Sequence, residues 1–273
     1  MVLCEIMDKD GIEKLAEDPR FISGIYNYCD RWCERCVFTS RCMNYALSEQ
    51  ESDSPESRDI HNQVFWDKLG GILSATLDMA REKAKEMGID LDALDTAEIA
   101  QQTERIHEMA KEQPHSRAAM KYVGMVDDWF ETNRWLLEAK GDELESLAQA
   151  DIPGTSPDDD AVKIRDCIEV VRWYHHQIYV KLCRAARGTI YDEFEDLECI
   201  QKDADGSAKV AIIGIERSAA AWAALLSHLP DLEHSIFHVL ATLKHLLKQV
   251  DASFPNARSF LRPGFDRTDD FEP

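Results

Sequence analysis

The sequence predicts an all-α fold: a bundle of about six long helices preceded by a small cysteine-rich N-terminal module. Two observations carry this prediction. From Ile60 onward, apolar residues recur at steps of three and four, which is the period of an amphipathic helix, and hardly any segment alternates as a strand does. The chain also has 273 residues, of which 44% are hydrophobic, so it is able to bury a sizeable core.

Residues 1–47 are the predicted module, and half of the chain's eight cysteines fall within fourteen residues of it. These are Cys29, Cys33, Cys36 and Cys42, in the pattern C-x3-C-x2-C-x5-C. Thiolates repel one another unless a cation holds them, so this dense group favours a single metal ion or cluster over disulfides. If the first three lay on one helix, they would share a face. Residues 48–59 are expected to be a polar linker.

Two partial resemblances involve the same cysteines. The spacing C-x3-C-x2-C of Cys29, Cys33 and Cys36 resembles that of radical S-adenosylmethionine enzymes, and the following C-x2-C-x5-C is similar to the end of the 4Fe-4S loop of helix-hairpin-helix DNA glycosylases. The chain has neither the strand and helix alternation of the first family nor the basic DNA-facing surface of the second. It is therefore assigned to neither.

The four cysteines predict a 4Fe-4S cluster that serves electron transfer, redox sensing or a redox reaction in the adjoining bundle. The alternative is a structural zinc ion on the same thiolates, in a scaffold or interaction protein. The tight grouping favours iron and sulfur, since zinc sites more often pair two C-x2-C knuckles across a longer loop. Aromatic residues adjacent in sequence are placed to cover the site, and nearby arginines are either counter-charges or ordinary surface charge: Trp32, Phe38, Tyr45, Arg31, Arg35 and Arg41.

Residues 60–253 are the predicted bundle domain. Its helices are expected from Ile60 to before Gly88, from near Leu91 to residue 113, from Ala119 to before Gly141 with a short extension to Ala150, and over 160–187, 208–229 and 230–250. Glycine is expected to end several of them, Gly188 included. Residues 151–160 are a loop rich in turn formers. Residues 254–273 are an irregular tail whose Phe254, Phe260, Leu261 and Phe265 are placed to pack on the bundle.

Three helices carry the expected core. The helix over 160–187 has apolar residues on two opposite sides, which predicts that its neighbours enclose it. The helix over 208–229 has a heptad-like seam, which also permits pairing between subunits in a homo-oligomer. In the helix over 160–187, one side carries Ile164, Ile168, Val171, Ile178 and Leu182, and the opposite side carries Val162, Trp173 and Val180. The seam over 208–229 consists of Ala208, Ile212, Ile215, Ala219, Trp222, Leu226 and Leu229. The last helix has its apolar positions at Leu232, Ile236, Val239, Leu243, Leu246 and Val250.

A helical bundle raises a third possibility, a di-iron or heme-oxygenase-like oxidase with carboxylate and histidine ligands. Glu104-x-x-His107 has the required step, and Glu169 and His176 are candidates for the remaining ligands. His175 falls on the inner stripe, where a neutral core histidine is expected and a ligand is the alternative. His234, His238 and His245 lie opposite the seam of the last helix and are expected to face solvent or a partner.

Composition limits the partners. The chain has 31 Lys and Arg against 52 Asp and Glu, a formal charge of −21, which repels phosphates and argues against nucleic acid and anionic membranes.

The N-terminus lacks a signal sequence, and no apolar stretch is expected to span a membrane, so a cytoplasmic protein with a protein redox or binding partner is predicted. Cys4, Cys167, Cys183 and Cys199 are then expected to be free thiols. Phosphate-loop and serine-hydrolase motifs are missing, and whether the chain is an enzyme stays open.

Overall fold

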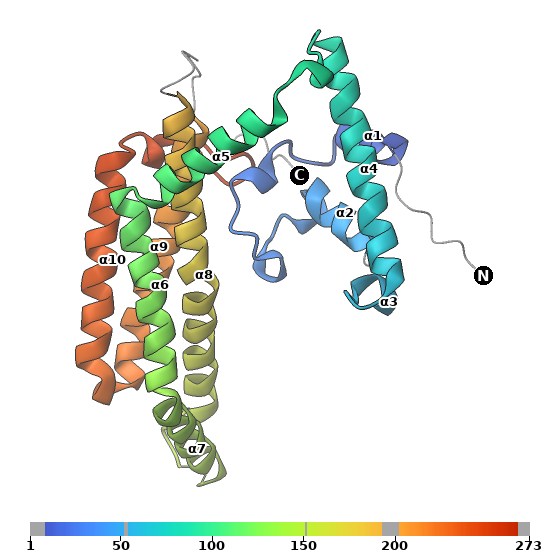
Figure 1. The fold of residues 1–273 in the computed structure, drawn as a ribbon. Coiled ribbons are helices and arrows are strands. Elements are labelled where there is room, and N and C mark those ends of the chain that lie inside the picture. Colours follow the sequence, from blue (N-terminus) through green and yellow to red (C-terminus); the bar gives the residue numbers. More distant parts are fainter. Residues whose placement is uncertain (1–8, 52–53, 151, 193–201, 267–273) are drawn as a thin grey trace. The chain divides into compact units, whose positions relative to one another are not determined.

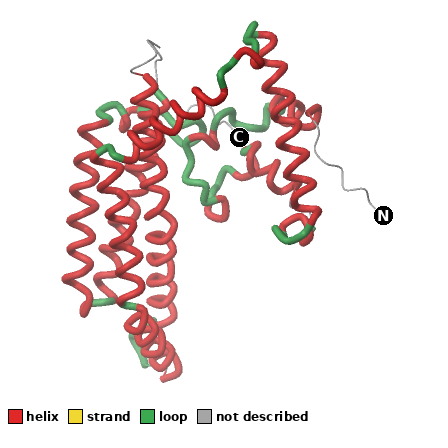
Figure 2. Tube along the Cα trace, in the orientation of Figure 1, coloured by secondary structure: helices red, strands yellow, loops and turns green. Residues whose placement is uncertain are grey.

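The computed structural model describes residues 9–51, 54–150, 152–192 and 202–266. Within these ranges the regular elements are all helical and none is a strand, which confirms the all-α class (Figure 2). The chain divides into two compact units. One comprises the residues up to Gln101 together with those from Leu261 onward, and the other comprises Gln102–Phe260.

Four long helices form the core of the second unit: α6 (Pro114–Thr132), α8 (Pro157–Asp192), α9 (Asp203–His228) and α10 (Glu233–Ser253). They lie side by side, and each runs opposite to its neighbours (Figure 1). α6 packs against α8 and α10, and α9 packs against the same two helices. The four therefore close into an antiparallel four-helix bundle, in which each helix turns one apolar face to the centre.

The seams predicted for the last two helices line this centre. All six predicted positions from Leu232 to Val250 are buried, as expected. In α9 the seam is confirmed at both ends, but Leu225 is buried where Leu226 was expected. A straight helix has 3.6 residues per turn, so a strict seven-residue repeat drifts around it. Trp222 fills the middle, 4.7 Å from the Trp129 ring, and its indole N–H donates to the Tyr122 hydroxyl at 3.2 Å.

The prediction for α8 was wrong in one respect. Val171, Ile178 and Leu182 are buried as expected, but Val162 and Val180 on the opposite side are 60% and 58% exposed. α8 is one of four equivalent members of a ring rather than an enclosed central helix. A pattern in one sequence cannot tell an apolar residue that meets a neighbouring helix from one that stays in water.

The number of helices in the bundle also differs from the expected six. α4 (Gln63–Glu86) belongs to the first unit, while α5 (Thr96–Lys111) and α7 (Arg134–Ala150) flank the four core helices. The last turns of α5 bury Ile106 and Ala110 in one cluster with Ala186 and Ile190 of α8. α7 packs on α8 and buries Leu144. The bundle therefore has a core of four helices.

α8 and α9 approach closely at two glycines. A Cβ on Gly188 would lie 3.1–3.3 Å from Ala204, including its backbone nitrogen, and one on Gly214 would lie 3.1 Å from Tyr174 and Ile178. Gly188 was expected to end its helix, yet α8 continues to Asp192. Its role is to admit the backbone of α9, a function that depends on a contact between distant parts of the chain.

Gly188→Ala is expected to destabilise the protein by about 1–3 kcal/mol, because the added methyl group meets a backbone that cannot move aside. Gly141→Ala is the matched control, since it lies within α7 with no atom near the new Cβ, and it should stabilise by about 0.5–1 kcal/mol. Chemical denaturation of both variants measures the difference. Equal effects of the two substitutions would contradict the close approach at Gly188.

His115 at the start of α6 is buried, with its ring edge-on to Phe254 at 5.0 Å. Its Nε2 atom has no hydrogen-bond partner within the described part of the chain. Burial lowers the pKa of His115 to about 4. The folded protein therefore holds this ring neutral, whereas the unfolded chain protonates it near its ordinary pKa of 6.5.

The unfolded state binds the extra proton first, so His115 should reduce the free energy of unfolding as the pH falls from 6.5 to about 4, by on the order of 3 kcal/mol in total. His115→Phe keeps a ring against Phe254 and removes this contribution. Urea denaturation of both proteins at several pH values tests the expectation. The lowered pKa of His175 acts in the same direction in both, so the difference between them isolates His115. Parallel pH profiles would refute the role of His115.

α9 is long and apolar enough to cross a membrane by length and composition, although no such segment was expected from the sequence. The same composition is required of a helix at the centre of a bundle. About half of its most apolar window is buried inside the protein, including Ile212, Ile215 and Trp222 against the neighbouring helices. Packing against α8 and α10 therefore accounts for its composition.

In chain order, the first unit contains α1 (Lys9–Glu17), three 3₁₀ turns, α2 (Met43–Glu51), α3 (Pro55–Arg58), the long helix α4, a further 3₁₀ turn (Leu91–Ala93) and the start of α5. Part of the expected linker at 48–59 is thus helical, and Ser54 and Ser57 form a capping box at the start of α3. Lys9 of α1 pairs with Glu82 of α4. Among its described residues, Ile25 and Ala84 are the buried apolar side chains.

Candidate metal centre

The four cysteines lie on irregular chain between and after short 3₁₀ turns. Cys33 opens the turn Cys33–Arg35 and Cys36 closes it, with the Cys36 N–H donating to the Cys33 carbonyl at 3.1 Å. Cys42 closes the next turn, Thr39–Arg41, in the same way. The first three cysteines therefore do not lie on one helix, so they do not share a helical face. Two consecutive tight turns bring the chain back on itself.

Arg31 provides the sharpest bend between Cys29 and Cys33. Its φ of 54° lies in the left-handed region, which costs a residue with a Cβ roughly 1–2 kcal/mol. The Asp30 carboxylate stabilises this turn by accepting the N–H of Trp32 at 3.3 Å. The bend turns the chain so that both thiols border the same space.

All four cysteines line one small pocket of about 20 Å³. Aromatic side chains make up much of the remaining wall: Tyr26, Trp32, Phe38, Tyr45 and Phe265. Burial and the negative charges of the other three thiolates raise the pKa of Cys33. Among the described residues, no three of these sulfur atoms all lie within 4.8 Å of one another. All four cysteines thus border one space.

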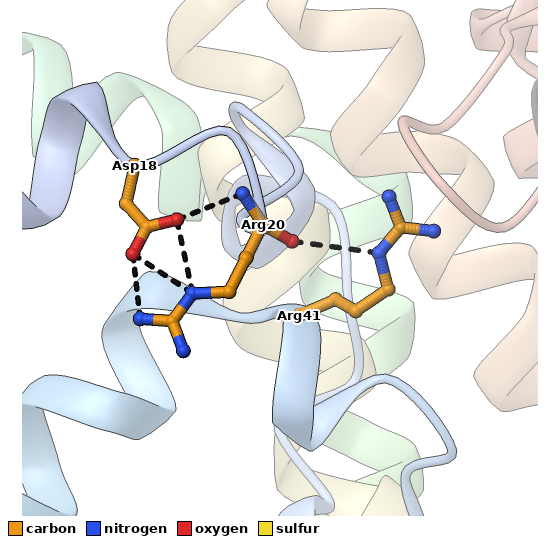
Figure 3. Close-up of polar contacts among 3 residues, drawn as sticks. All are labelled: Asp18, Arg20 and Arg41. Carbon is orange, nitrogen blue, oxygen red and sulfur yellow. Dashed lines mark hydrogen bonds and ion pairs between the residues drawn. The ribbon is translucent and has the colours of Figure 1, made fainter.

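The three nearby arginines have different surroundings. Arg31 lines the pocket, whereas the guanidinium of Arg35 stacks on the Trp32 ring at 4.0 Å from its centre. Arg41 donates from Nε to the Arg20 carbonyl at 3.4 Å (Figure 3). Of the three arginines for which counter-charge and surface charge were left open, Arg31 borders the space between the cysteines, and the other two contact the surrounding chain.

The start of the module is tied to Arg41 by polar contacts (Figure 3). Arg20 forms a two-pronged ion pair with Asp18, with Nη2 to Oδ2 at 2.6 Å, and this pair holds the pKa of Asp18 below its usual range. The Ile22 N–H also donates to the Arg41 carbonyl at 3.0 Å. These contacts bring the chain before the first cysteine to the residue that precedes the last one.

The C-terminal segment 261–266 completes the module. Phe265 meets the Phe38 ring edge-on at 5.0 Å, and Arg262 pairs with Asp266 at 3.0 Å. Gly264 has a φ of 77°, and a Cβ there would lie 3.0 Å from the side chains of Ile22 and Ile25. Four residues of the tail, Phe254, Phe260, Leu261 and Phe265, were expected to pack on the bundle. Phe254 and Phe260 are indeed buried in the second unit, but Phe265 belongs to the first.

Phe265→Ala is expected to expose the thiols, because it removes one aromatic wall of the pocket. In reduced protein freed of metal, the reaction of the four cysteines with an aromatic disulfide reagent should be several-fold faster than in the wild type. Val37→Ala is the control, since Val37 lies within the same loop but is 83% exposed. Equal rates for the wild type and the Phe265 variant would contradict the covering role of Phe265.

The candidate di-iron ligands are not brought together. His107 Nε2 accepts a hydrogen bond from Arg187 at 2.6 Å, whereas His176 lies beside His175, with ring centres 4.4 Å apart. Arg187 and His176 are eleven residues apart on α8, which corresponds to about 16 Å along a helix. Glu104 and Glu169 are exposed. His234, His238 and His245 are exposed on α10, as expected.

A group that the sequence analysis missed lies in the second unit. Asp127 of α6 joins His175 and His176 of α8, and one ligand atom from each lies within 4.8 Å of the others. The sequence placed the two histidines on different faces of their helix, and Asp127 was not singled out. The adjacent His-His pair was the one local signal, and it becomes informative only when α6 supplies a carboxylate beside it.

Two of the other cysteines lie in the described part of the bundle. Cys167 is buried, and burial raises the pKa of its thiol. Cys183 is half-buried next to Tyr179. Cys4 and Cys199 fall outside the described residues. The expected free thiols are therefore found where they can be described.

No protein-family model, no curated protein and no solved structure matches this chain. The functional argument therefore rests on the geometry of its own side chains.

Proposed function

We propose that the chain is an iron-sulfur protein in which Cys29, Cys33, Cys36 and Cys42 hold a 4Fe-4S cluster. The cluster would serve electron transfer, redox sensing or a redox reaction. The observation that carries the proposal is the arrangement of the four thiols, which line one pocket from a single fourteen-residue stretch.

The separation of the sulfur atoms favours a cluster over a single ion. Tetrahedral zinc binds sulfur at about 2.3 Å, which would hold the sulfur atoms about 3.8 Å from one another. A cluster binds each thiolate through a different iron, so its ligands stand farther apart. No three of the four sulfur atoms all lie within 4.8 Å of one another. The other three cysteines are nevertheless close enough for their charges to contribute to the raised pKa of Cys33. The sulfur atoms are therefore not drawn together as tightly as a single tetrahedral ion requires.

The small core of the first unit supports a bound metal of either kind. With Ile25 and Ala84 as the buried apolar side chains among its described residues, the unit gains little stability from the hydrophobic effect. Metal–thiolate bonds contribute folding free energy directly, and they remove the repulsion that raises the pKa of Cys33.

The side chains around the pocket and the charge of the chain would affect the reduction potential and the partner of such a cluster. Aromatic walls from Trp32, Phe38 and Phe265 limit the access of water, which is one of the factors that set the reduction potential of a cluster. The formal charge of −21 favours a partner protein with a basic docking surface, since complementary charge speeds encounter.

Structural zinc is the alternative, and one feature of the pocket favours it. The space between the thiols is only about 20 Å³, which suits a single ion better than a cluster. We give more weight to the sulfur positions, since they concern the ligand atoms, whereas the free volume depends on the faces of rings that rotate. With zinc, the module would be a structural element of a binding or scaffold protein.

The test is metal analysis of full-length protein purified without oxygen, together with its absorption spectrum. About four irons with equal sulfide and a broad band at about 400 nm are expected, and Cys33→Ser should lose all three. Cys183→Ser is the matched control and should keep them, because Cys183 lies on α8 outside the module.

One zinc per chain, lost in Cys33→Ser, would replace the iron-sulfur proposal by the structural zinc site. Iron without sulfide that survives Cys33→Ser would refute both and direct the search to the carboxylate and histidine side chains.

A further inference from the structure

A second group of metal-ligating side chains lies at a cavity of the four-helix bundle. The cavity measures about 640 Å³, and its lining includes Asp127, His175, Glu131, Glu138, Arg134 and Arg172. His176 adjoins it through His175, with ring centres 4.4 Å apart. α6 contributes Asp127 and α8 contributes both histidines, so two rigid, packed helices hold the group.

We propose that Asp127, His175 and His176 bind a divalent first-row transition-metal ion at the rim of this cavity. The three ligand atoms lie within 4.8 Å of one another, and two imidazoles with one carboxylate are a donor set suited to zinc, iron, cobalt or nickel. The site uses none of the four cysteines and does not depend on the iron-sulfur proposal.

The hydrogen bonding of His175 prepares its ring as a ligand. Nδ1 lies 2.7 Å from the Arg172 carbonyl oxygen, which can only accept, so Nδ1 carries a proton. In the neutral ring the lone pair is then on Nε2. A histidine that donates its other N–H to a backbone carbonyl is the usual arrangement around protein-bound metals, because it fixes the tautomer and the ring plane.

The contact between His175 and Asp127 calls for a cation. Nε2 of His175 lies 3.3 Å from Oδ1 of Asp127, so a lone pair faces a carboxylate oxygen unless a proton or a metal ion joins them. His176 supplies a third ligand atom at the same place. A metal ion satisfies all three groups, whereas a proton satisfies two.

Access and charge complete the argument. Asp127 and His176 are exposed, so an ion enters from solvent, while the buried His175 anchors it. Three protein ligands leave coordination positions open. Three carboxylates and two guanidinium groups line the cavity, so its lining carries one negative charge in excess. These groups belong to Asp127, Glu131, Glu138, Arg134 and Arg172. A divalent ion reverses that balance, so a small carboxylate is the expected additional ligand.

Zinc titrated calorimetrically into full-length protein tests the site, with X-ray absorption to identify the donor atoms. Asp127→Asn and His176→Ala change exposed side chains and leave the core intact, and each should weaken this binding event by about tenfold or more, since loss even of an outer-shell partner has effects of that size. The zinc should show only nitrogen and oxygen neighbours at about 2.0–2.2 Å, without sulfur at about 2.3 Å. Acetate should tighten zinc binding, because the two ligands favour each other's binding.

Two controls separate this site from other zinc-binding groups. The double variant His234→Ala, His238→Ala removes an exposed histidine pair on α10 and should leave the affinity unchanged, as should Cys33→Ser. Zinc binding that is unchanged in both Asp127→Asn and His176→Ala, or that is lost in the α10 double variant, would overturn the proposal. Acetate that weakens binding would overturn the open coordination position.

Discussion

Mutual repulsion among four thiolates is the constraint on which the N-terminal unit depends. Burial, and after it the charges of Cys29, Cys36 and Cys42, raises the pKa of Cys33, so the loop disfavours the thiolate form of this residue. A unit that buries little apolar surface among its described residues has little else to hold these groups together. Its turns, the left-handed Arg31 and the aromatic walls all serve to keep the sulfur atoms around one space. The proposed metal would replace that repulsion by metal–thiolate bonds, which would stabilise the unit.

The bundle is stabilised by close packing instead. Gly188 and Gly214 let α8 and α9 approach closely, and Trp222 fills the centre among Trp129 and Tyr122. Such a core holds helices at fixed separations and rotations. That rigidity matters for chemistry at the surface of the bundle, because it places a carboxylate of α6 against two histidines of α8 without any loop between them. Ligands on packed helices keep their geometry better than ligands on loops.

The two candidate metal centres bring their ligands together in different ways. The cysteine loop concentrates its candidate ligands in a short stretch of sequence. The Asp127, His175 and His176 group instead draws on residues 48 positions apart, which the packed core of the bundle holds together. Soft thiolates suit iron-sulfur clusters and zinc, and imidazoles with a carboxylate suit harder divalent ions. Each centre can therefore be lost by substitution without removing the ligands of the other.

The sequence by itself determined the all-α class, the buried seam of α10, most of that of α9 and the candidate cysteines, because each of these is written in the spacing of neighbouring residues. Only the tertiary structure decided the rest. From the sequence, Gly188 predicts the end of a helix, but in the structure it lies within α8 against Ala204. Val180 predicts a core position, but its side chain is exposed. Phe265 joins the cysteines, and Asp127 joins His175, across separations that no local period records. Such contacts arise from the packing of whole elements, so one chain's pattern cannot specify them.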